Sequence, residues 1–187
     1  SNAYNDRGMV YYRQNNYTAA LNDYNAAIKN DPAYFLAYKN RATVQVALKN
    51  YAAADNDYTK CIELKPEDAD GYLGRGSMKS IQNNYAEAIS FYDKAIQYEP
   101  NNAVTFLNRG NAKYALKDTK GALPDYIKVS QLQPNNVNVY FNLGTIYMTQ
   151  NKSNEAIEAF KKYNSGLPNE WSGYKNTADV YYSQLKQ

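Results

Sequence analysis

The sequence predicts an all-α solenoid, built from antiparallel helical hairpins that stack one on the next. Three observations support this prediction. Five of the six prolines recur every 34 residues, columns of small and aromatic residues recur with the same period, and no convincing strand appears. The evenly spaced prolines are Pro32, Pro66, Pro100, Pro134 and Pro168.

Numbering each repeat from 1 to 34 puts these prolines at position 32 and brings four further columns into register. Position 4 carries an aromatic ring: Tyr4, Tyr38, Tyr72, Phe106, Tyr140 and Tyr174. Position 8 is small: Gly8, Ala42, Gly76, Gly110, Gly144 and Ala178. Position 20 is alanine: Ala20, Ala54, Ala88, Ala122 and Ala156. Position 24 is aromatic: Tyr24, Tyr58, Tyr92, Tyr126 and Phe160.

Each repeat is expected to begin with a helix over about positions 2–14 and to continue, after a turn, with a second helix over about positions 18–30. The polar pairs between them favour a turn, because short polar side chains bond to nearby backbone or tolerate left-handed conformations. These pairs are Asn15-Asn16, Lys49-Asn50, Asn83-Asn84 and Lys117-Asp118. The proline at position 32 ends the second helix, since it lacks an N–H group. The small residues at positions 8 and 20 let the helices approach where they cross, and the rings at positions 4 and 24 fill the wider space around the crossing.

The repeats are expected to occupy residues 4–34, 35–68, 69–102, 103–136 and 137–170, and residues 171–187 are expected to form a sixth first helix that caps the stack. Ser1 to Ala3 resemble the remnant of a cleaved affinity tag and are left out of the repeats. Pro124 stands outside the proline column, at position 22, with Gly121 nearby. We therefore expect a late-starting or bent second helix in the fourth repeat.

This pattern resembles the tetratricopeptide repeat family over essentially all of residues 4–187. The resemblance rests on the order of residues within the 34-residue period: an aromatic residue, then Leu-Gly after two other residues, and then Tyr, Ala, Phe and Pro. The resemblance implies a right-handed superhelix that binds extended peptides on its concave side, which is lined by the first helices. It implies no catalysis, no cofactor and no metal.

The chain departs from the family at position 7, where the consensus is apolar but this sequence has Arg7, Arg41, Arg75 and Arg109. The second helices of repeats 1, 2 and 4 carry Asp23, Asp57 and Asp125 at position 23, so we expect an Arg–Asp pair across each of these hairpins. Repeat 3 has Phe91 there and needs Asp93 or a neighbouring repeat instead, and the fifth repeat has Leu143 with Ala159.

Composition excludes several kinds of chemistry. Histidine is absent, which removes the commonest general base and metal ligand. The single cysteine, Cys61, falls in a column of small residues, so packing is the favoured interpretation over a reactive thiol. The net charge of +3 is too small to indicate a nucleic-acid or anionic-membrane partner, and no stretch is long and apolar enough to span a membrane. The sequence predicts no enzyme activity and leaves the cellular compartment open.

The most informative surface is formed by positions 2, 5, 6, 9 and 12 of the first helices, here called the first-helix face. Its centre is apolar and aromatic with amides beside it, and these side chains are the candidate peptide-binding residues. They are Lys39, Asn40, Leu73, Leu107, Asn108, Asn111, Tyr114, Phe141, Asn142, Met148 and Asn176.

Two hypotheses follow for this face. Asn108, Asn142 and Asn176 could form a ladder of amides that pairs with a peptide backbone, because an amide both donates and accepts. The clamp by which some family members hold the acidic tails of chaperones is not expected here, because Lys39 is followed by Thr43 and Gly74 where that clamp has asparagines. Asparagine at position 6 is also ordinary for the family, so a purely structural role stays open.

Three function classes compete. The favoured one is a non-catalytic scaffold for a peptide or partner protein of unknown identity. An adaptor in a cell-envelope or secretion assembly is the alternative, and an RNA-binding helical array is disfavoured because the first-helix face has few basic residues. Contact between copies of the chain also stays open.

Overall fold

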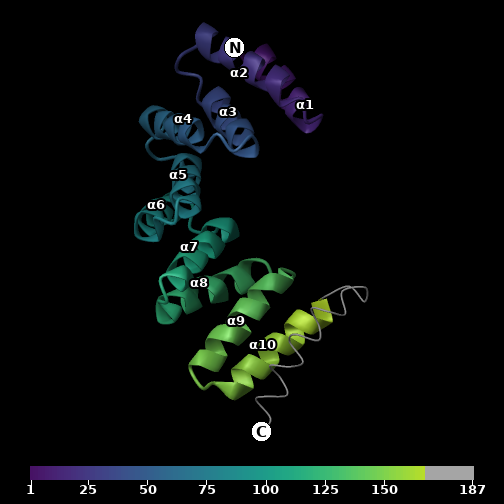
Figure 1. Ribbon diagram of the computed structural model, residues 1–187, viewed down its shortest axis with the longest axis vertical. Helices are drawn as coiled ribbons and strands as arrows, with labels where there is room; N and C mark the ends of the chain where they lie inside the picture. Colours follow the sequence, from purple (N-terminus) through teal and green to yellow (C-terminus); the bar gives the residue numbers. More distant parts are fainter. Residues whose placement is uncertain (167–187) are drawn as a thin grey trace. The chain divides into compact units, whose positions relative to one another are not determined.

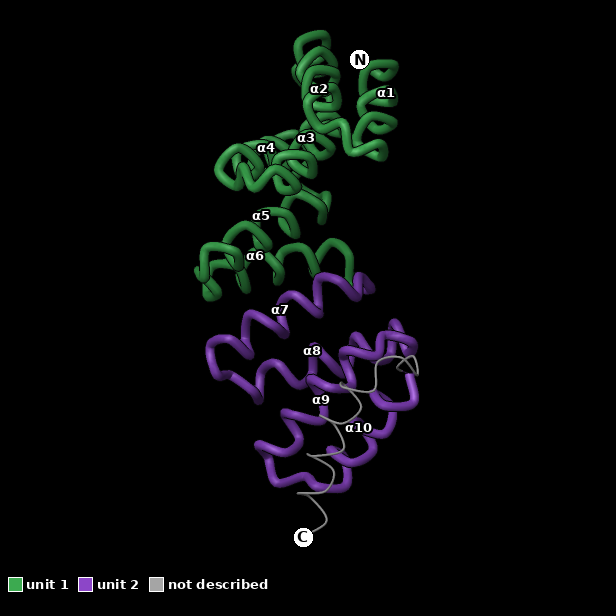
Figure 2. The backbone as a smooth tube through the Cα atoms, turned by 45° about the vertical axis from the view of Figure 1, so that its right-hand side comes forward, with its two compact units in different colours: residues 1–100 green, residues 101–187 purple. Residues whose placement is uncertain are grey.

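The computed structural model describes residues 1–166, and this part of the chain consists of helices without a strand (Figure 1). The helices are α1 (Asn2–Arg13), α2 (Tyr17–Asn30), α3 (Phe35–Ala47), α4 (Tyr51–Leu64), α5 (Ala69–Ile81), α6 (Tyr85–Tyr98), α7 (Ala103–Ala115), α8 (Thr119–Leu132), α9 (Val137–Thr149) and α10 (Ser153–Gly166). The chain divides into two compact units, residues 1–100 and residues 101–187 (Figure 2). The first unit holds α1 to α6, and the described part of the second holds α7 to α10.

Within each unit, every helix packs against the next one along the chain, and α1 also contacts α3. This arrangement confirms the predicted all-α solenoid of helical hairpins. The helix bounds differ from the prediction by about one residue. The second helices begin at position 17 of the repeat instead of 18, and the first helices end at position 13 instead of 14. α1 begins at Asn2, inside the segment compared above with a tag remnant. The expected capping helix of residues 171–187 lies outside the described residues.

The turn inside each hairpin places one residue in the left-handed region. These residues all stand at position 15 of the repeat: Asn15 (φ 59°), Lys49 (61°), Asn83 (62°), Lys117 (65°) and Asn151 (57°). The left-handed turn predicted from the polar pairs is therefore confirmed, and it follows from the asparagines that three of the five turns use.

In four of the five described hairpins, an aromatic ring at position 24 packs directly against a glycine at position 8. A Cβ added to Gly8 would lie 2.7 Å from the Tyr24 ring, and one added to Gly76 would lie 2.6 Å from Tyr92. The same contact joins Gly110 to Tyr126 and Gly144 to Phe160. The ring at position 24 thus lies directly against the small residue at position 8 in these hairpins. The missing Cβ at position 8 is what admits the ring.

The second repeat solves this packing differently. Ala42 stands where the other described hairpins have glycine, and the Tyr58 ring packs both against the cluster of Ala42, Ala54 and Met78 and against the next repeat. A Cβ on Gly74 of α5 would come within 2.4 Å of that ring. Position 6 carries a polar residue in the other repeats, but here it is Gly74. The extra methyl group of Ala42 takes up space beside the Tyr58 ring, and the absence of a side chain at Gly74 provides space for that ring in the neighbouring repeat.

The rings at position 4 secure the connection between repeats. The hydroxyl groups of Tyr38, Tyr72 and Tyr140 donate to the carbonyl oxygen of the proline six residues earlier, at 3.2, 2.9 and 3.0 Å. The proline has no N–H of its own, and its carbonyl lies beyond the end of the preceding helix. The tyrosine therefore gives this carbonyl a partner and fixes the start of the following hairpin.

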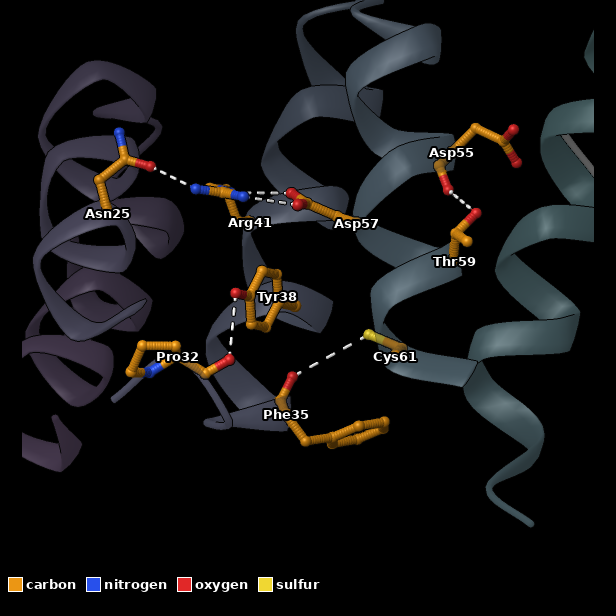
Figure 3. Close-up of polar contacts among 9 residues, drawn as sticks. All are labelled: Asn25, Pro32, Phe35, Tyr38, Arg41, Asp55, Asp57, Thr59 and Cys61. Atoms are coloured by element: carbon orange, nitrogen blue, oxygen red, sulfur yellow. Dashed lines mark hydrogen bonds and ion pairs between the residues drawn. The ribbon is translucent and has the colours of Figure 1, made fainter. Parts of the chain in front are cut away.

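The predicted Arg–Asp pairs are present in repeats 1, 2 and 4. Arg41 donates from Nε and Nη2 to both carboxylate oxygens of Asp57, at 2.8 and 2.6 Å, and from Nη1 to Asn25 of the preceding repeat at 2.6 Å (Figure 3). Arg7 makes the same forked contact with Asp23, and Arg109 makes it with Asp125. The geometry is bidentate, the strongest arrangement for a guanidinium and a carboxylate.

In the third repeat, the arginine at position 7 pairs with an aspartate of the neighbouring repeat, which was one of the two expected alternatives. Arg75 donates to Asp55 of α4 at 3.0 Å, and its guanidinium stands 4.6 Å from the centre of the Phe91 ring. Phe91 occupies the place of the missing aspartate. The arginine therefore exchanges an ion pair within its own hairpin for a cation–π contact and an ion pair between hairpins.

Of the two alternatives expected for the fourth repeat's second helix, the late start is wrong, and the bend stays a prediction. α8 begins at Thr119, the same repeat position as α2, α4 and α6, and Pro124 lies inside it. Asp118 caps this helix by accepting from the Gly121 N–H at 2.8 Å. The cap fixes the first turn before the proline is reached, and the buried side chains of Ala122 and Tyr126 hold the helix against α7.

Candidate functional site

Among residues 1–166, no three or more histidine, cysteine, aspartate or glutamate side chains come together as potential metal ligands. Cys61 is buried, its Sγ faces the Phe35 carbonyl at 4.0 Å (Figure 3), and burial raises the pKa of its thiol to about 12. A thiol held in this state is a poor nucleophile, which supports the packing interpretation.

In the first unit, the polar candidates of the first-helix face already bond to their neighbours. The Lys39 ammonium forms an ion pair with Asp70 of the next repeat. Asn40 donates from Nδ2 to Oδ1 of the buried Asn5 at 2.8 Å. Leu73 is half-buried. These contacts join successive first helices, so Lys39 and Asn40 serve the stacking of repeats.

Position 9 is likewise occupied by contacts within the protein. The hydroxyl groups of Thr43, Ser77 and Thr145 each donate to the backbone carbonyl four residues earlier, at 2.9 to 3.1 Å. Asn111 accepts a hydrogen bond from the Tyr126 hydroxyl at 2.8 Å. The hydroxyl donors at position 9 are therefore used within the protein, and Asn111 is held through its amide oxygen.

The link between Asn111 and Tyr126 shows a role that the sequence reasoning missed. The Tyr126 ring is buried, burial raises the pKa of its hydroxyl, and that hydroxyl needs a partner where it emerges at the first helix. Tyr92 meets Ser80 in the same way at 3.0 Å. The available signal was the choice of tyrosine at position 24, because a phenylalanine such as Phe160 makes no such demand.

In the second unit, two amides differ from those just described. Asn108 and Asn142 stand at position 6 of successive repeats, both are half-buried, and neither has a hydrogen-bonding partner within residues 1–166. The third member of the predicted ladder, Asn176, lies outside the described residues. The two described amides thus keep both a donor and an acceptor available on the first-helix face.

The apolar candidates differ in how far they are exposed. Tyr114 is 37% exposed, and Leu107 is half-buried. Phe141 packs edge-on to Phe160 with ring centres 5.9 Å apart, and Met148 lies against the same cluster. Phe141 and Met148 consequently belong partly to the core of the fifth hairpin, and Tyr114 is the large side chain most accessible to a ligand.

Within the part of the chain that the structure describes, none of the helices has the length and apolar character needed to cross a membrane.

Comparisons with known proteins give one consistent result. Sequence models described as tetratricopeptide repeat match residues 1–34 and 40–103, and a model described as TPR repeat matches residues 110–151. No curated protein sequence matches the chain.

Solved structures match over almost the whole chain. One, reported as the functional characterization of Pseudomonas aeruginosa pilF, has a TM-score of 0.82 at 21% identity and covers 99% of this chain and 90% of that one. PilW, described as a widely conserved type IV pilus biogenesis factor, has a TM-score of 0.78 at 24% identity, with 99% and 91% covered. YrrB, described as a TPR protein with an unusual peptide-binding site, has a TM-score of 0.72 at 19% identity, with 89% and 86% covered. At these identities the likeness shows the fold.

Proposed function

Because this chain belongs to the tetratricopeptide repeat family, whose members are typically non-catalytic protein-interaction scaffolds, we propose that it binds an extended segment of a partner protein. The binding surface is the first-helix face of the second unit, carried by α7 and α9. The peptide backbone pairs with the amides of Asn108 and Asn142, and Tyr114 and Leu107 contact its side chains.

The observation that carries the proposal is the contrast among the amides of the first-helix face. Asn40 is already bonded to Asn5, and Asn111 to Tyr126. Asn108 and Asn142 have no such partner among residues 1–166. Hydrogen bonds from a ligand to a half-buried, unpaired amide favour binding, because burial has already weakened the contact of that amide with water.

Peptides selected from a displayed random library on the immobilised protein provide the ligand for a test. Their affinity is then measured by fluorescence polarisation with wild type, with the double variant Asn108→Ala/Asn142→Ala, and with Asn40→Ala as the matched control. Each lost neutral hydrogen bond costs about 1 kcal/mol, so the double variant should bind about thirtyfold more weakly.

The control separates binding from folding. Asn40→Ala should lower the stability of the first unit, because Oδ1 of the buried Asn5 loses its donor, and should leave peptide affinity unchanged. Selected peptides that bind the double variant as tightly as wild type, with circular dichroism showing both proteins folded, would refute the proposed amide pairing.

An adaptor in a cell-envelope assembly is the second candidate function. It is favoured by the likeness in fold to PilW over 99% of this chain. The gene sequence upstream of residue 4 tests it. A leader followed by a lipidated cysteine would support envelope placement, and a fused cytosolic domain would count against it.

A further inference from the structure

The second unit contains a recess that none of the residues of the first-helix face lines. It is a shallow pocket of about 650 Å³ between α8, α9 and α10. Its lining includes the apolar side chains of Ile127, Leu143 and Ala159 and the charged side chains of Glu155, Glu158 and Lys162 from α10. This recess is formed by different repeat positions from those that form the first-helix face.

The same place in the second repeat is filled by a polar triad. Arg41 and Asp57 stand there at positions 7 and 23, and Asn25 reaches them from position 25 of the preceding repeat, with three hydrogen bonds of 2.6 to 2.8 Å among them (Figure 3). The fifth repeat has Leu143 and Ala159 at positions 7 and 23, and Ile127 stands at position 25 of the repeat before it. The fifth repeat therefore lacks both the guanidinium and the carboxylate, and the pocket lies where the arginine side chain would otherwise stand.

The aromatic ring that lines the pocket can make a cation–π contact. In repeats 1, 2 and 4 the arginine at position 7 stands over the ring at position 4, with distances of 5.6, 5.5 and 5.4 Å to the ring centre. The fifth repeat retains that ring as Tyr140, which lines the pocket. The Lys162 ammonium lies 5.3 Å from its centre, so the ring still attracts positive charge.

The rim supplies the opposite charge. In the third repeat, Glu87 pairs with Lys79 at 3.0 Å. Glu155 is the fifth-repeat counterpart of Glu87, but Tyr147 replaces the lysine, and Glu155 has no ion-pair partner within residues 1–166. A carboxylate at the edge of an apolar pocket beside an aromatic wall is complementary to a cation with an apolar stem.

We propose that this pocket binds an arginine side chain of a partner protein. The guanidinium lies between the Glu155 carboxylate and the Tyr140 ring, and its alkyl stem covers Leu143 and Ala159. The incoming arginine takes the place that an arginine of the chain itself fills in the earlier repeats. This site is independent of the amide pairing proposed for the first-helix face.

The test uses N-acetyl-arginine amide as the probe and its uncharged isostere, N-acetyl-citrulline amide, as the control. Binding is followed through the backbone amide signals of the full chain by two-dimensional NMR. The arginine probe should shift signals from α9 and α10 in a saturable manner, and the citrulline probe should not. N-acetyl-lysine amide should bind more weakly, because an ammonium cannot stack on the ring as a planar guanidinium does.

Three variants sharpen the result. Leu143→Arg/Ala159→Asp rebuilds the pair of the earlier repeats, so it should fold, fill the pocket and abolish the shifts. Glu155→Gln should weaken the probe about threefold, as expected for a partly exposed ion pair, whereas Lys162→Ala should strengthen it by removing a competing cation.

Equal shifts with the citrulline probe would overturn the proposal, as would unchanged binding by the Leu143→Arg/Ala159→Asp variant. Shifts spread over carboxylates throughout the chain would mean that the probe associates by charge alone, which also overturns it.

Discussion

The fifth repeat provides a natural substitution with which to test the buried pair of the second. Arg41 and Asp57 lie where Leu143 and Ala159 stand three repeats later. The side chain of Asp57 is 5% exposed and that of Arg41 is 21% exposed. The forked contact with Asp57 is the chief reason that the pKa of Arg41 is raised. The informative variants are Arg41→Leu, Asp57→Ala and the double variant.

The two single changes should differ in cost. Arg41→Leu leaves a buried carboxylate without its cation and should lower the free energy of unfolding by about 3 kcal/mol. Asp57→Ala should cost about 2 kcal/mol, because the guanidinium keeps Asn25 and partial access to water. The double variant should cost about 1 kcal/mol or less, since an apolar pair replaces the ionic one and neither charge is left unpaired.

Urea unfolding followed by circular dichroism measures all three changes. The double variant is thus expected to be about 4 kcal/mol more stable than the sum of the single losses, which is the coupling between the two side chains. A double variant whose loss equals that sum would refute the claim that each charge is buried only because of the other. The Arg7–Asp23 pair is the matched control, and its coupling should be smaller because the Arg7 side chain is 58% exposed.

Three further outcomes are expected. Gly74→Ala should destabilise the chain by about 1 to 3 kcal/mol in urea unfolding, because its Cβ would meet the Tyr58 ring at 2.4 Å. Adding Ala42→Gly should recover part of that loss by reopening the position-8 site, and no recovery would contradict the packing account. Cys61 should react with a thiol reagent at pH 8 only after denaturation, since burial raises its pKa to about 12; rapid labelling of the native chain would disprove this. Burial also raises the pKa of Tyr24 to about 12 from its ordinary 10, so its contribution to stability is complete below pH 10 and is lost between about pH 10 and 12. The melting temperature should fall less steeply with pH across that range for Tyr24→Phe than for wild type. Identical slopes for the two proteins would count against a raised pKa of Tyr24.

Local regularities in the sequence settled the architecture of each hairpin. The 34-residue period of the prolines predicted where second helices end, and the polar pairs predicted the turns that now contain Asn15 and Lys49 in left-handed conformations. The pairing of Arg41 with Asp57 also followed from two columns of the repeat. These features depend on residues within a single hairpin, and repetition makes them visible without any knowledge of the third dimension.

Contacts between hairpins were decided only by the tertiary structure. The sequence left the partner of Arg75 between two choices, and Asp55 lies in the preceding repeat. The turn of the Tyr58 ring toward Gly74, and the pocket left by Leu143 and Ala159, depend on how a side chain of one repeat meets its neighbour. Periodicity describes what the repeats share, whereas these features arise where one repeat differs from the next. A pocket or an unpaired charge that results from such a difference exists only once the hairpins are stacked.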